Sequence, residues 1–257
     1  MITLYENVFS PFSRKVRMVI EYKGLDATYI DGLNRDNHAA LNAVNTRMEV
    51  PALLDDDLVV VNSADIVAYL DHRYPDRPVL PTDPALRVGA RAWERAADSA
   101  IDPILVDISI WIWAERNDTM PDGLLEAGRR DLSKFYHALE RQLGDDEYFM
   151  GDISIADFAL FPHLRSAATL GAPIDATLFP KLSAWLTRFN ALDIAKRDTE
   201  RLRSYLQNIG TENVEREKIF WRGDRIEWLL ANGYHEWFVK EIDEGRMLWP
   251  SPGVPAT

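Results

Sequence analysis

The chain has 257 residues, no cysteine and a formal net charge of −12, and 47% of its residues are hydrophobic. This composition is normal for a globular protein and differs from that of disordered chains. Because phosphate binding depends on clustered Lys and Arg, the acidic balance argues against a nucleic-acid-binding protein. The absence of cysteine excludes a disulfide framework, a thiolate metal site and a cysteine nucleophile.

The sequence also argues against a membrane protein. No uncharged run approaches the roughly 18 residues that a transmembrane helix needs, and the longest, at 247–257, contains three prolines. The first residues lack a basic segment followed by a long apolar core, so we expect no secretory signal. These features predict a cytoplasmic protein with no membrane partner.

The first 75 residues alternate short strands and helices. Strands are expected at 2–5, 27–30, 50–54 and 58–61, and helices at 13–23, 37–42 and 63–74. Gly24 follows the first helix at the usual position of a C-terminal cap, and Pro75 ends the third helix. The acidic turn between the last two strands predicts a hairpin. The order β-α-β-α-β-β-α therefore indicates a small α/β domain.

A proline-rich linker separates this domain from a helical region. Prolines recur at 75, 78, 81 and 84, a spacing that favours extended backbone. The following residues, to about 207, show helical periodicity, with breaks near 117–121, 144–152, 171–173 and 193. The pattern predicts an all-α domain of four or five helices.

The last 50 residues form a third region. Amphipathic stretches at 212–221, 224–230 and 235–244 are separated by glycines, and the region holds four of the eight tryptophans. So much aromatic surface is costly to leave in water, so we expect this tail to fold and to pack on the body or on a partner.

A serine at the junction of the first strand and the first helix is the first candidate for chemistry. In Ser10-Pro11-Phe12-Ser13, a hydroxyl stands near unpaired backbone N–H groups at the positive end of the helix dipole. Such a position stabilises an anion, including a thiolate that forms on a bound ligand, although an ordinary N-cap has the same pattern. The neighbouring Arg14, Lys15 and Arg17 are expected to be solvated.

Three further motifs follow along the chain. Pro51 opens a strand, so it marks either a simple turn or a cis Val50–Pro51 bond that presents the Val50 backbone to a ligand. Ser63 follows a strand at the start of a helix, where it either caps the helix or holds a carboxylate. Ser154-Ile155-Ala156-Asp157 is a capping box, which we interpret as structural.

Together and in this order, these motifs resemble those of the glutathione S-transferase superfamily, most closely its serine-type classes (tau, zeta and their bacterial relatives). The resemblance covers residues 1 to about 207. It implies a thioredoxin-like N-terminal domain at 1–76 and an all-helical C-terminal domain at 84–207. Residues 208–257 lie beyond the resemblance and are expected to form a helical C-terminal extension. The resemblance also implies a homodimeric detoxification enzyme in the cytoplasm.

The resemblance implies a role for individual residues as well. Ser10 would activate the glutathione sulfur, with Ser13 as the alternative, and Val50 would pair with the cysteinyl backbone. Ser63 would bind the γ-glutamyl carboxylate. The full glutathione-binding set implied is Ser10, Phe12, Glu49, Val50, Pro51, Asn62 and Ser63.

This chemistry explains the missing cysteine, because glutathione supplies the thiol as co-substrate and the protein only lowers its pKa. The thiolate then attacks a hydrophobic electrophile. Ile108, Trp111 and Ile112 are either an apolar wall for that electrophile or part of the core or a dimer interface.

Two positions depart from the family pattern. Asn62 replaces a common Glu or Gln, and Glu49 replaces a Gln or Lys that contacts the glycine carboxylate; Arg35 or Arg47 are candidates to offset the charge of Glu49.

A competing hypothesis is a regulator without catalytic activity. Residues 62–84 also resemble the stringent starvation protein A group, which has the transferase fold and binds RNA polymerase. That group tends to lack a serine at the position of Ser10, so the enzyme is favoured. The five histidines show no metal-binding spacing, and no metal site is predicted. Asp102 and Asp107 either line the cleft or, as is far more common for acidic residues on a helix, are exposed, which is the expectation here.

Overall fold

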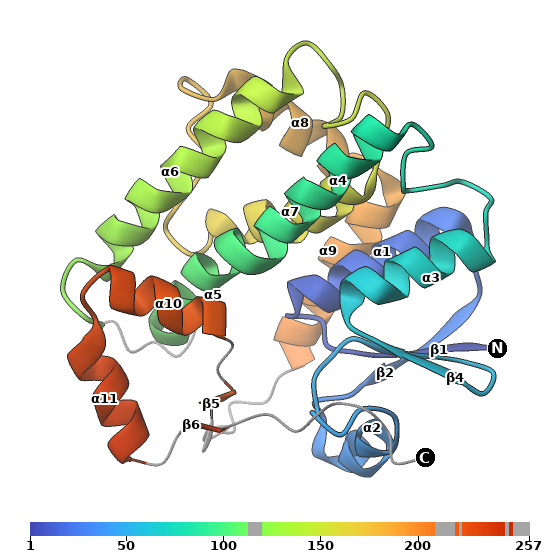
Figure 1. Cartoon of the computed structure of the whole chain (residues 1–257), viewed down its shortest axis with the longest axis horizontal. Coiled ribbons are helices and arrows are strands. Elements are labelled where there is room, and N and C mark those ends of the chain that lie inside the picture. Colours follow the sequence, from blue (N-terminus) through green and yellow to red (C-terminus); the bar gives the residue numbers. More distant parts are fainter. Residues whose placement is uncertain (113–119, 209–218, 221–222, 245–246, 249–257) are drawn as a thin grey trace.

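The computed structural model describes residues 1–112, 120–208, 219–220, 223–244 and 247–248. A mixed sheet with its helices forms the N-terminal part of the molecule, and a larger group of helices packs against it (Figure 1). This is the predicted fold, a thioredoxin-like α/β unit followed by an all-helical unit.

The sheet has the strand order β2-β1-β3-β4, in which only the β1–β2 pair is parallel. Its strands are β1 (Ile2–Glu6), β2 (Ala27–Asp31), β3 (Ala52–Asp55) and β4 (Leu58–Val61). The helices between them are α1 (Pro11–Lys23), α2 (His38–Val44) and α3 (Ser63–Arg73), and a short 3-10 turn, Arg35–Asn37, precedes α2. The antiparallel β3–β4 pair confirms the predicted hairpin.

Alternation of side chains along the strands gives the sheet two buried faces. Leu4 and Leu53 join the main core, which includes buried side chains of α1 and α3. Their neighbours Tyr5 and Ala52 point to the opposite face, where α2 covers them. Figure 1 shows α1 and α3 above the sheet and α2 below it. The α1 helix ends at Gly24, whose φ of 71° is left-handed, as the sequence predicted.

The helical region consists of five continuous helical stretches in its described part, in agreement with the predicted breaks. The first runs through α4 (Pro84–Ala96), a π-helical turn (Ala97–Ile101) and α5 (Asp102–Ile112). The others are α6 (Leu124–Leu143), α7 (Ile155–Ala167), α8 (Pro180–Asn190) and α9 (Asp193–Asn208).

The capping box at the start of α7 is structural, as predicted. The Asp157 carboxylate accepts hydrogen bonds from the N–H and hydroxyl of Ser154, at 2.9 and 3.0 Å, and from Trp185 Nε1 at 2.8 Å. Burial raises the pKa of Asp157 to about 6 despite these donors. Asp157 therefore ties α7 to α8 inside the core.

The C-terminal tail contains α10 (Gly223–Ala231) and α11 (His235–Asp243) and a short parallel pair, β5 (Ile219–Phe220) with β6 (Met247–Leu248). The predicted stretch at 212–221 lies mostly outside the described residues, and its residues 219–220 are a strand. Tryptophans 221 and 249 also lie outside them.

The α10 helix packs on the body, as expected for the tail. Leu229 is fully buried beside Leu124, the first residue of α6. The buried carboxylate of Asp102 accepts a hydrogen bond from Arg225 Nη2 at 3.0 Å. The expectation that Asp102 and Asp107 are exposed was wrong, since both are fully buried. Among the described residues, no helix is long and apolar enough to cross a bilayer.

Candidate active site

The register of the sheet brings the predicted motifs to one edge. Tyr5 of β1 lies opposite Ala52 of β3, which lies opposite Val61 of β4. The segment after β1, the segment before β3 and the segment after β4 therefore meet. They carry Ser10, Val50–Pro51 and Asn62–Ser63, so three motifs far apart in sequence share one site.

Ser10 is the N-cap of α1, and its hydroxyl remains able to donate. Its Oγ accepts a hydrogen bond from the Ser13 N–H at 3.2 Å, while no acceptor for the Ser10 hydroxyl proton exists among the described residues. The residue is half-buried at the positive end of α1. It can therefore donate a hydrogen bond to an anion bound at this edge.

Ser13, the alternative activator, is in a different environment. It is fully buried, and its Oγ accepts a hydrogen bond from the Asn7 N–H at 3.3 Å. A hydroxyl without exposed surface cannot reach a ligand at the edge of the sheet. The arrangement thus favours Ser10 as the residue that meets the ligand.

The Val50–Pro51 peptide bond is cis, the second of the two alternatives left open by the sequence. Within the described part of the chain, neither the N–H nor the C=O of Val50 has a hydrogen-bond partner. Val50 is half-buried, and Pro51 is buried next to the start of β3. The Val50 backbone is thus available for sheet-like pairing with an extended ligand.

Asn62 and Ser63 begin α3 beside this segment. Asn62 has a positive φ of 73° with ψ at 121°, a conformation that non-glycine residues adopt at a cost. Its side chain caps α3 by accepting the Ala64 N–H at 3.3 Å. Asn62 is exposed and Ser63 is buried, and the Ser63 hydroxyl bonds to no other described residue. The pair offers a helix N-terminus and a hydroxyl to a carboxylate.

The charge of Glu49 is offset by its neighbour. Arg47 donates from Nε and Nη2 to the two carboxylate oxygens of Glu49, both at 2.9 Å. Of the two candidate cations, Arg47 is the one that pairs with Glu49, and Arg35 lies exposed in a separate turn. Because the Arg47–Glu49 pair is neutral as a unit, Glu49 repels a nearby ligand carboxylate less than a lone glutamate.

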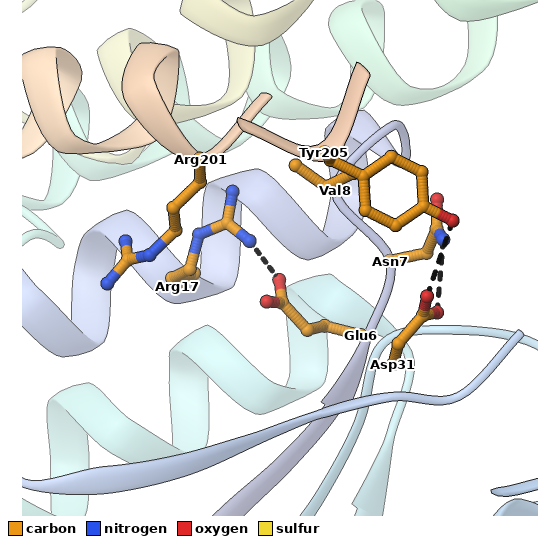
Figure 2. Close-up of a pocket in the computed structure, with 7 residues that line it drawn as sticks. All are labelled: Glu6, Asn7, Val8, Arg17, Asp31, Arg201 and Tyr205. Carbon is orange, nitrogen blue, oxygen red and sulfur yellow. Dashed lines mark hydrogen bonds and ion pairs between the residues drawn. The ribbon is translucent and has the colours of Figure 1, made fainter. Parts of the chain in front are cut away.

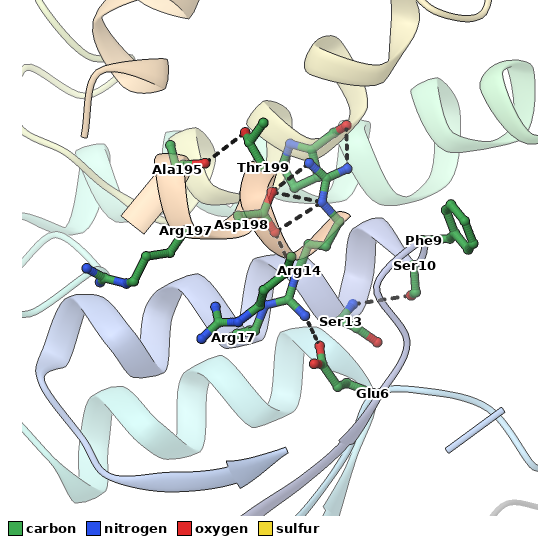
Figure 3. A network of polar contacts seen from close by, with 12 residues as sticks. Glu6, Phe9, Ser10, Ser13, Arg14, Arg17, Ala195, Arg197, Asp198 and Thr199 are labelled. Carbon is green, nitrogen blue, oxygen red and sulfur yellow. Dashed lines mark hydrogen bonds and ion pairs between the residues drawn. The ribbon is translucent and has the colours of Figure 1, made fainter. Parts of the chain in front are cut away.

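The basic residues of α1 are buried, so the expectation that they are solvated was wrong. Arg14 and Arg17 each donate to Asp198 of α9, with nitrogen–oxygen distances of 2.7 Å (Figure 3). Arg17 also pairs with Glu6, and Lys15 pairs with Glu94 at 3.0 Å. The partners lie up to 184 residues away, which explains why local periodicity did not show them. These ion pairs fix α1, and thus Ser10, against the helical region.

Burial and charge compete at these carboxylates. For Asp198, burial alone would raise the pKa, but Arg14 and Arg17 outweigh it and hold the pKa below its ordinary value. For Glu6, burial outweighs Arg17 and raises the pKa. Although both carboxylates belong to one network, the pKa of Asp198 lies below its ordinary value and the pKa of Glu6 lies above it.

A cavity of about 180 Å³ lies on the α9 side of the segment that leads to Ser10 (Figure 2). Its lining residues are Glu6, Asn7, Val8, Arg17, Asp31, Arg201 and Tyr205. None of the predicted glutathione-binding residues lines it. No sequence pattern indicated Asn7, Asp31 or Tyr205, which come together here from the segment after β1, from β2 and from α9.

Of the two alternatives for the apolar stripe on α5, the structure supports core packing for Ile108 and Ile112. Ile108 is fully buried and packs closely against α6. A Cβ added at Gly128 of that helix would lie only 2.3 Å from Ile108 Cδ1. Ile108 is therefore core. Ile112 is half-buried against the same core, and the side chain of Trp111 lies outside the described residues. Phe12 stacks edge-on against His163 of α7, with 6.0 Å between ring centroids.

Comparison with known proteins agrees with this arrangement. Residues 4–78 match the family described as "Glutathione S-transferase, N-terminal domain", and residues 108–193 match "Glutathione S-transferase, C-terminal domain". The chain belongs to the glutathione S-transferase superfamily. The first match contains Ser10, Val50–Pro51 and Asn62–Ser63, and the second contains α7 with its capping box.

Individual relatives extend the comparison. The chain is 31% identical to glutathione S-transferase U19 of Arabidopsis thaliana, over 70% of this chain and 80% of the plant protein. It is 30% identical to glutathione S-transferase 1 of Manduca sexta, over 77% and 91% of the two chains. Ure2p5 of Phanerochaete chrysosporium, crystallised with 1-(S-glutathionyl)-2,4-dinitrobenzene, shares the fold with a TM-score of 0.69, 20% identity and coverage of 81% and 97%.

Proposed function

We propose that this transferase-superfamily member is a serine-type glutathione S-transferase, which activates the glutathione thiol for attack on a hydrophobic electrophile. The observation that carries the proposal is the environment of the Ser10 hydroxyl. This half-buried hydroxyl has no acceptor among the described residues, stands at the N-terminus of α1, and shares a sheet edge with the free Val50 backbone and the Ser63 hydroxyl.

In this proposal Ser10 lowers the pKa of the bound thiol. A hydroxyl that donates a hydrogen bond to sulfur favours the thiolate over the thiol, and the positive end of α1 adds to the effect. Neither group carries a full charge of its own. The Ser13 N–H bond to Ser10 Oγ holds the hydroxyl oxygen in place, so its hydrogen is left to point away from the helix.

The remaining residues of the set would orient glutathione. Val50 pairs through its N–H and C=O with the cysteinyl backbone, while Ser63 and the start of α3 hold the γ-glutamyl carboxylate. Asn62 accepts from the ligand's ammonium group in place of the longer Glu or Gln. Phe12, Glu49 and Pro51 complete the set, with the charge of Glu49 offset by Arg47.

The reaction is an ordinary nucleophilic transfer. The thiol proton leaves to solvent, and the sulfur lone pair forms a bond to an electrophilic carbon. In a displacement, the leaving group departs with its bonding electrons. In an addition to an activated double bond, the resulting carbanion takes a proton. The conjugate bound to the fungal relative has the form of a displacement product on a dinitrobenzene ring.

The test compares Ser10→Ala with Ser13→Ala. With glutathione and a 1-halo-2,4-dinitrobenzene as substrates, Ser10→Ala should lower turnover about 10- to 100-fold, the effect of a lost hydrogen bond to a charged group. Calorimetric binding of glutathione should persist, because Val50 and Ser63 remain.

Ser13→Ala is the matched control, since it removes the hydroxyl one turn further along α1. It should lower stability slightly and leave turnover within about two-fold, because among the described residues its hydroxyl bonds to the Asn7 N–H alone, and the Ser13 N–H that holds Ser10 Oγ is kept. Turnover that is unchanged in Ser10→Ala and abolished in Ser13→Ala would reverse the assignment. No binding of glutathione to the wild-type protein would refute the proposed function.

The named relatives do not favour the alternative of a regulator without catalytic activity, because they are transferases. The finer expectations belong to the same proposal: domain boundaries at 1–76, 84–207 and 208–257, a homodimer, a location in the cytoplasm and a role in detoxification. Light scattering in solution tests the homodimer directly.

A further inference from the structure

Asn7 holds the segment that presents Ser10 with hydrogen bonds from both its backbone and its side chain. The Asn7 C=O accepts the Ser10 N–H at 3.0 Å, and Asn7 Oδ1 accepts the Phe9 N–H at 3.0 Å. The Asn7 N–H donates to Ser13 Oγ at 3.3 Å. Asn7 is buried, so these bonds are shielded from water. The conformation of residues 7–13 is therefore fixed around one asparagine.

The fourth polar group of Asn7 ties this segment to the rest of the protein. Asn7 Nδ2 donates to Asp31 Oδ1 at 3.1 Å, at the end of β2. The second carboxylate oxygen of Asp31 accepts from the Tyr205 hydroxyl of α9 at 3.4 Å, and Figure 2 shows the three side chains converging. The Tyr205 ring also packs edge-on against Phe9, with 5.2 Å between centroids.

We propose that Asn7 is a positioning residue for Ser10, which it holds through the Asn7–Asp31–Tyr205 clamp, the hydrogen-bonded series of these three side chains. Asn7 does not touch glutathione. It sets the direction of the Ser10 hydroxyl by fixing the backbone two and three residues further along the chain. This inference rests on the proposed role of Ser10 and goes beyond it.

The physical reason is the steep distance and angle dependence of a hydrogen bond. A shift of the Ser10 hydroxyl by a fraction of an ångström weakens its bond to sulfur without removing it. The expected signature is therefore a higher pKa of the bound thiol, with glutathione affinity largely retained. A residue with only a structural role would change stability and leave this pKa in place.

The primary test is Asn7→Asp, which is nearly isosteric. The new carboxylate still accepts the Phe9 N–H, but it replaces the donor to Asp31 with a second negative charge. We expect the pKa of the thiol of bound glutathione to rise by about one unit, and turnover near neutral pH to fall by up to about ten-fold. The matched control is Asn34→Asp, the same change at an exposed asparagine that caps the following 3-10 turn, which should alter neither.

The decisive variant is the exchange Asn7→Asp/Asp31→Asn. It restores one donor and one acceptor across the same gap, with the direction of the hydrogen bond reversed and the net charge unchanged. The double variant should return the thiol pKa to within about 0.3 units of wild type, a coupling typical of residues in direct contact. If Asn7→Asp is too unstable to measure, Asn7→Ser, which removes the link to Asp31 without adding charge, should raise the pKa similarly.

The outcomes separate this inference from the proposed function. If wild type lowers the thiol pKa, Ser10→Ala raises it, and Asn7→Asp and Asn7→Ser leave it unchanged, Ser10 is the activator and the positioning role is refuted. A pKa that rises in Asn7→Asp and stays raised in the exchange also refutes the clamp. If wild-type protein does not lower the thiol pKa at all, the proposed function itself fails.

Discussion

The helical region contacts α1 at one interface, called the inner joint, and α10 at another, called the outer joint. These two joints are built differently. At the joint between α1 and α9, Arg14 and Arg17 meet Asp198, and all three side chains are at most 3% exposed. At the joint between α10 and the helical region, Trp228 Nε1 donates to Asp131 at 3.2 Å and Arg130 contacts Asn232 at 2.6 Å, with Arg130 more than half exposed. The first joint is buried and ionic, whereas the second adds these solvent-accessible contacts to one buried ion pair, Arg225 with Asp102.

The stability of the fold depends most on charge where the ion pairs are buried. Arg14 and Arg17 share the Asp198 carboxylate; Arg17 also pairs with Glu6, whereas the compensation of Arg14 requires that Asp198 is ionised. The outer joint combines the apolar contact of Leu229 and the buried Arg225–Asp102 pair with contacts of Arg130 that are accessible to water. The inner joint also carries the helix that begins at Ser10, so its rigidity bears on the active site.

The largest expected effect is at the inner joint. Asp198→Asn keeps the shape of the side chain and removes its charge, which leaves Arg14 buried without its counterion. We expect the free energy of unfolding to fall by roughly 3–5 kcal/mol, measured by denaturant titration.

The matched control is Glu200→Gln on the same helix. Glu200 pairs with Arg203 at 2.6 Å, but both side chains are more than 60% exposed, so the same chemical change should cost about 0–0.5 kcal/mol. A loss of equal size in the two variants would show that burial does not distinguish these ion pairs.

The pH dependence of stability sharpens the same contrast. Arg14 and Arg17 hold the pKa of Asp198 below its ordinary value, so its ionised form stabilises the folded state above the unfolded pKa of about 3.9. This contribution is lost as the pH falls through the lower, folded-state pKa. Below about pH 4 the stability difference between wild type and Asp198→Asn should shrink; a difference that is constant or grows toward acid would contradict the assignment.

A smaller effect is expected at the outer joint. Although burial opposes it, hydrogen bonds from Arg130 and Lys134 hold the pKa of Asp131 at about 2. Asp131→Asn weakens these contacts, while its amide oxygen still accepts from Trp228. Local opening of α10 should become easier by about 1 kcal/mol, seen as faster hydrogen exchange of its amides with little change in global stability.

The control at this joint is Asp243→Asn, at the exposed end of α11, which should leave exchange in α10 unchanged. Global unfolding that accompanies Asp131→Asn would mean that the extension is part of the main cooperative unit.

Local signals made much of the fold predictable. The glycine after α1 and the box at Ser154–Asp157 are short-range patterns with a mechanical cause, and they end and begin a helix where expected. The α1 helix itself begins at Pro11, two residues before the expected start. The cis bond before Pro51 was one of two alternatives. The sequence motifs also identified the residues that the sheet register brings to one edge.

Long-range partnerships were not predictable. Nothing near Arg14 indicates a carboxylate 184 residues away, so its burial was missed. The sequence does not single out Asn7, because its role depends on Asp31 and Tyr205 from distant segments. Asp102 was expected to be exposed for the same reason, since its partner Arg225 belongs to the C-terminal tail.

The most direct test of the central claim is the pKa of the glutathione thiol in its complex with the protein, measured from the ultraviolet absorbance of the thiolate as a function of pH. Because the chain has no cysteine, every thiol signal belongs to glutathione. We expect the wild-type complex to titrate well below the ordinary thiol pKa of about 8.5, and the Ser10→Ala complex to titrate close to it. A wild-type value equal to that of free glutathione, or a lowered value that Ser10→Ala leaves in place, would contradict the role of Ser10.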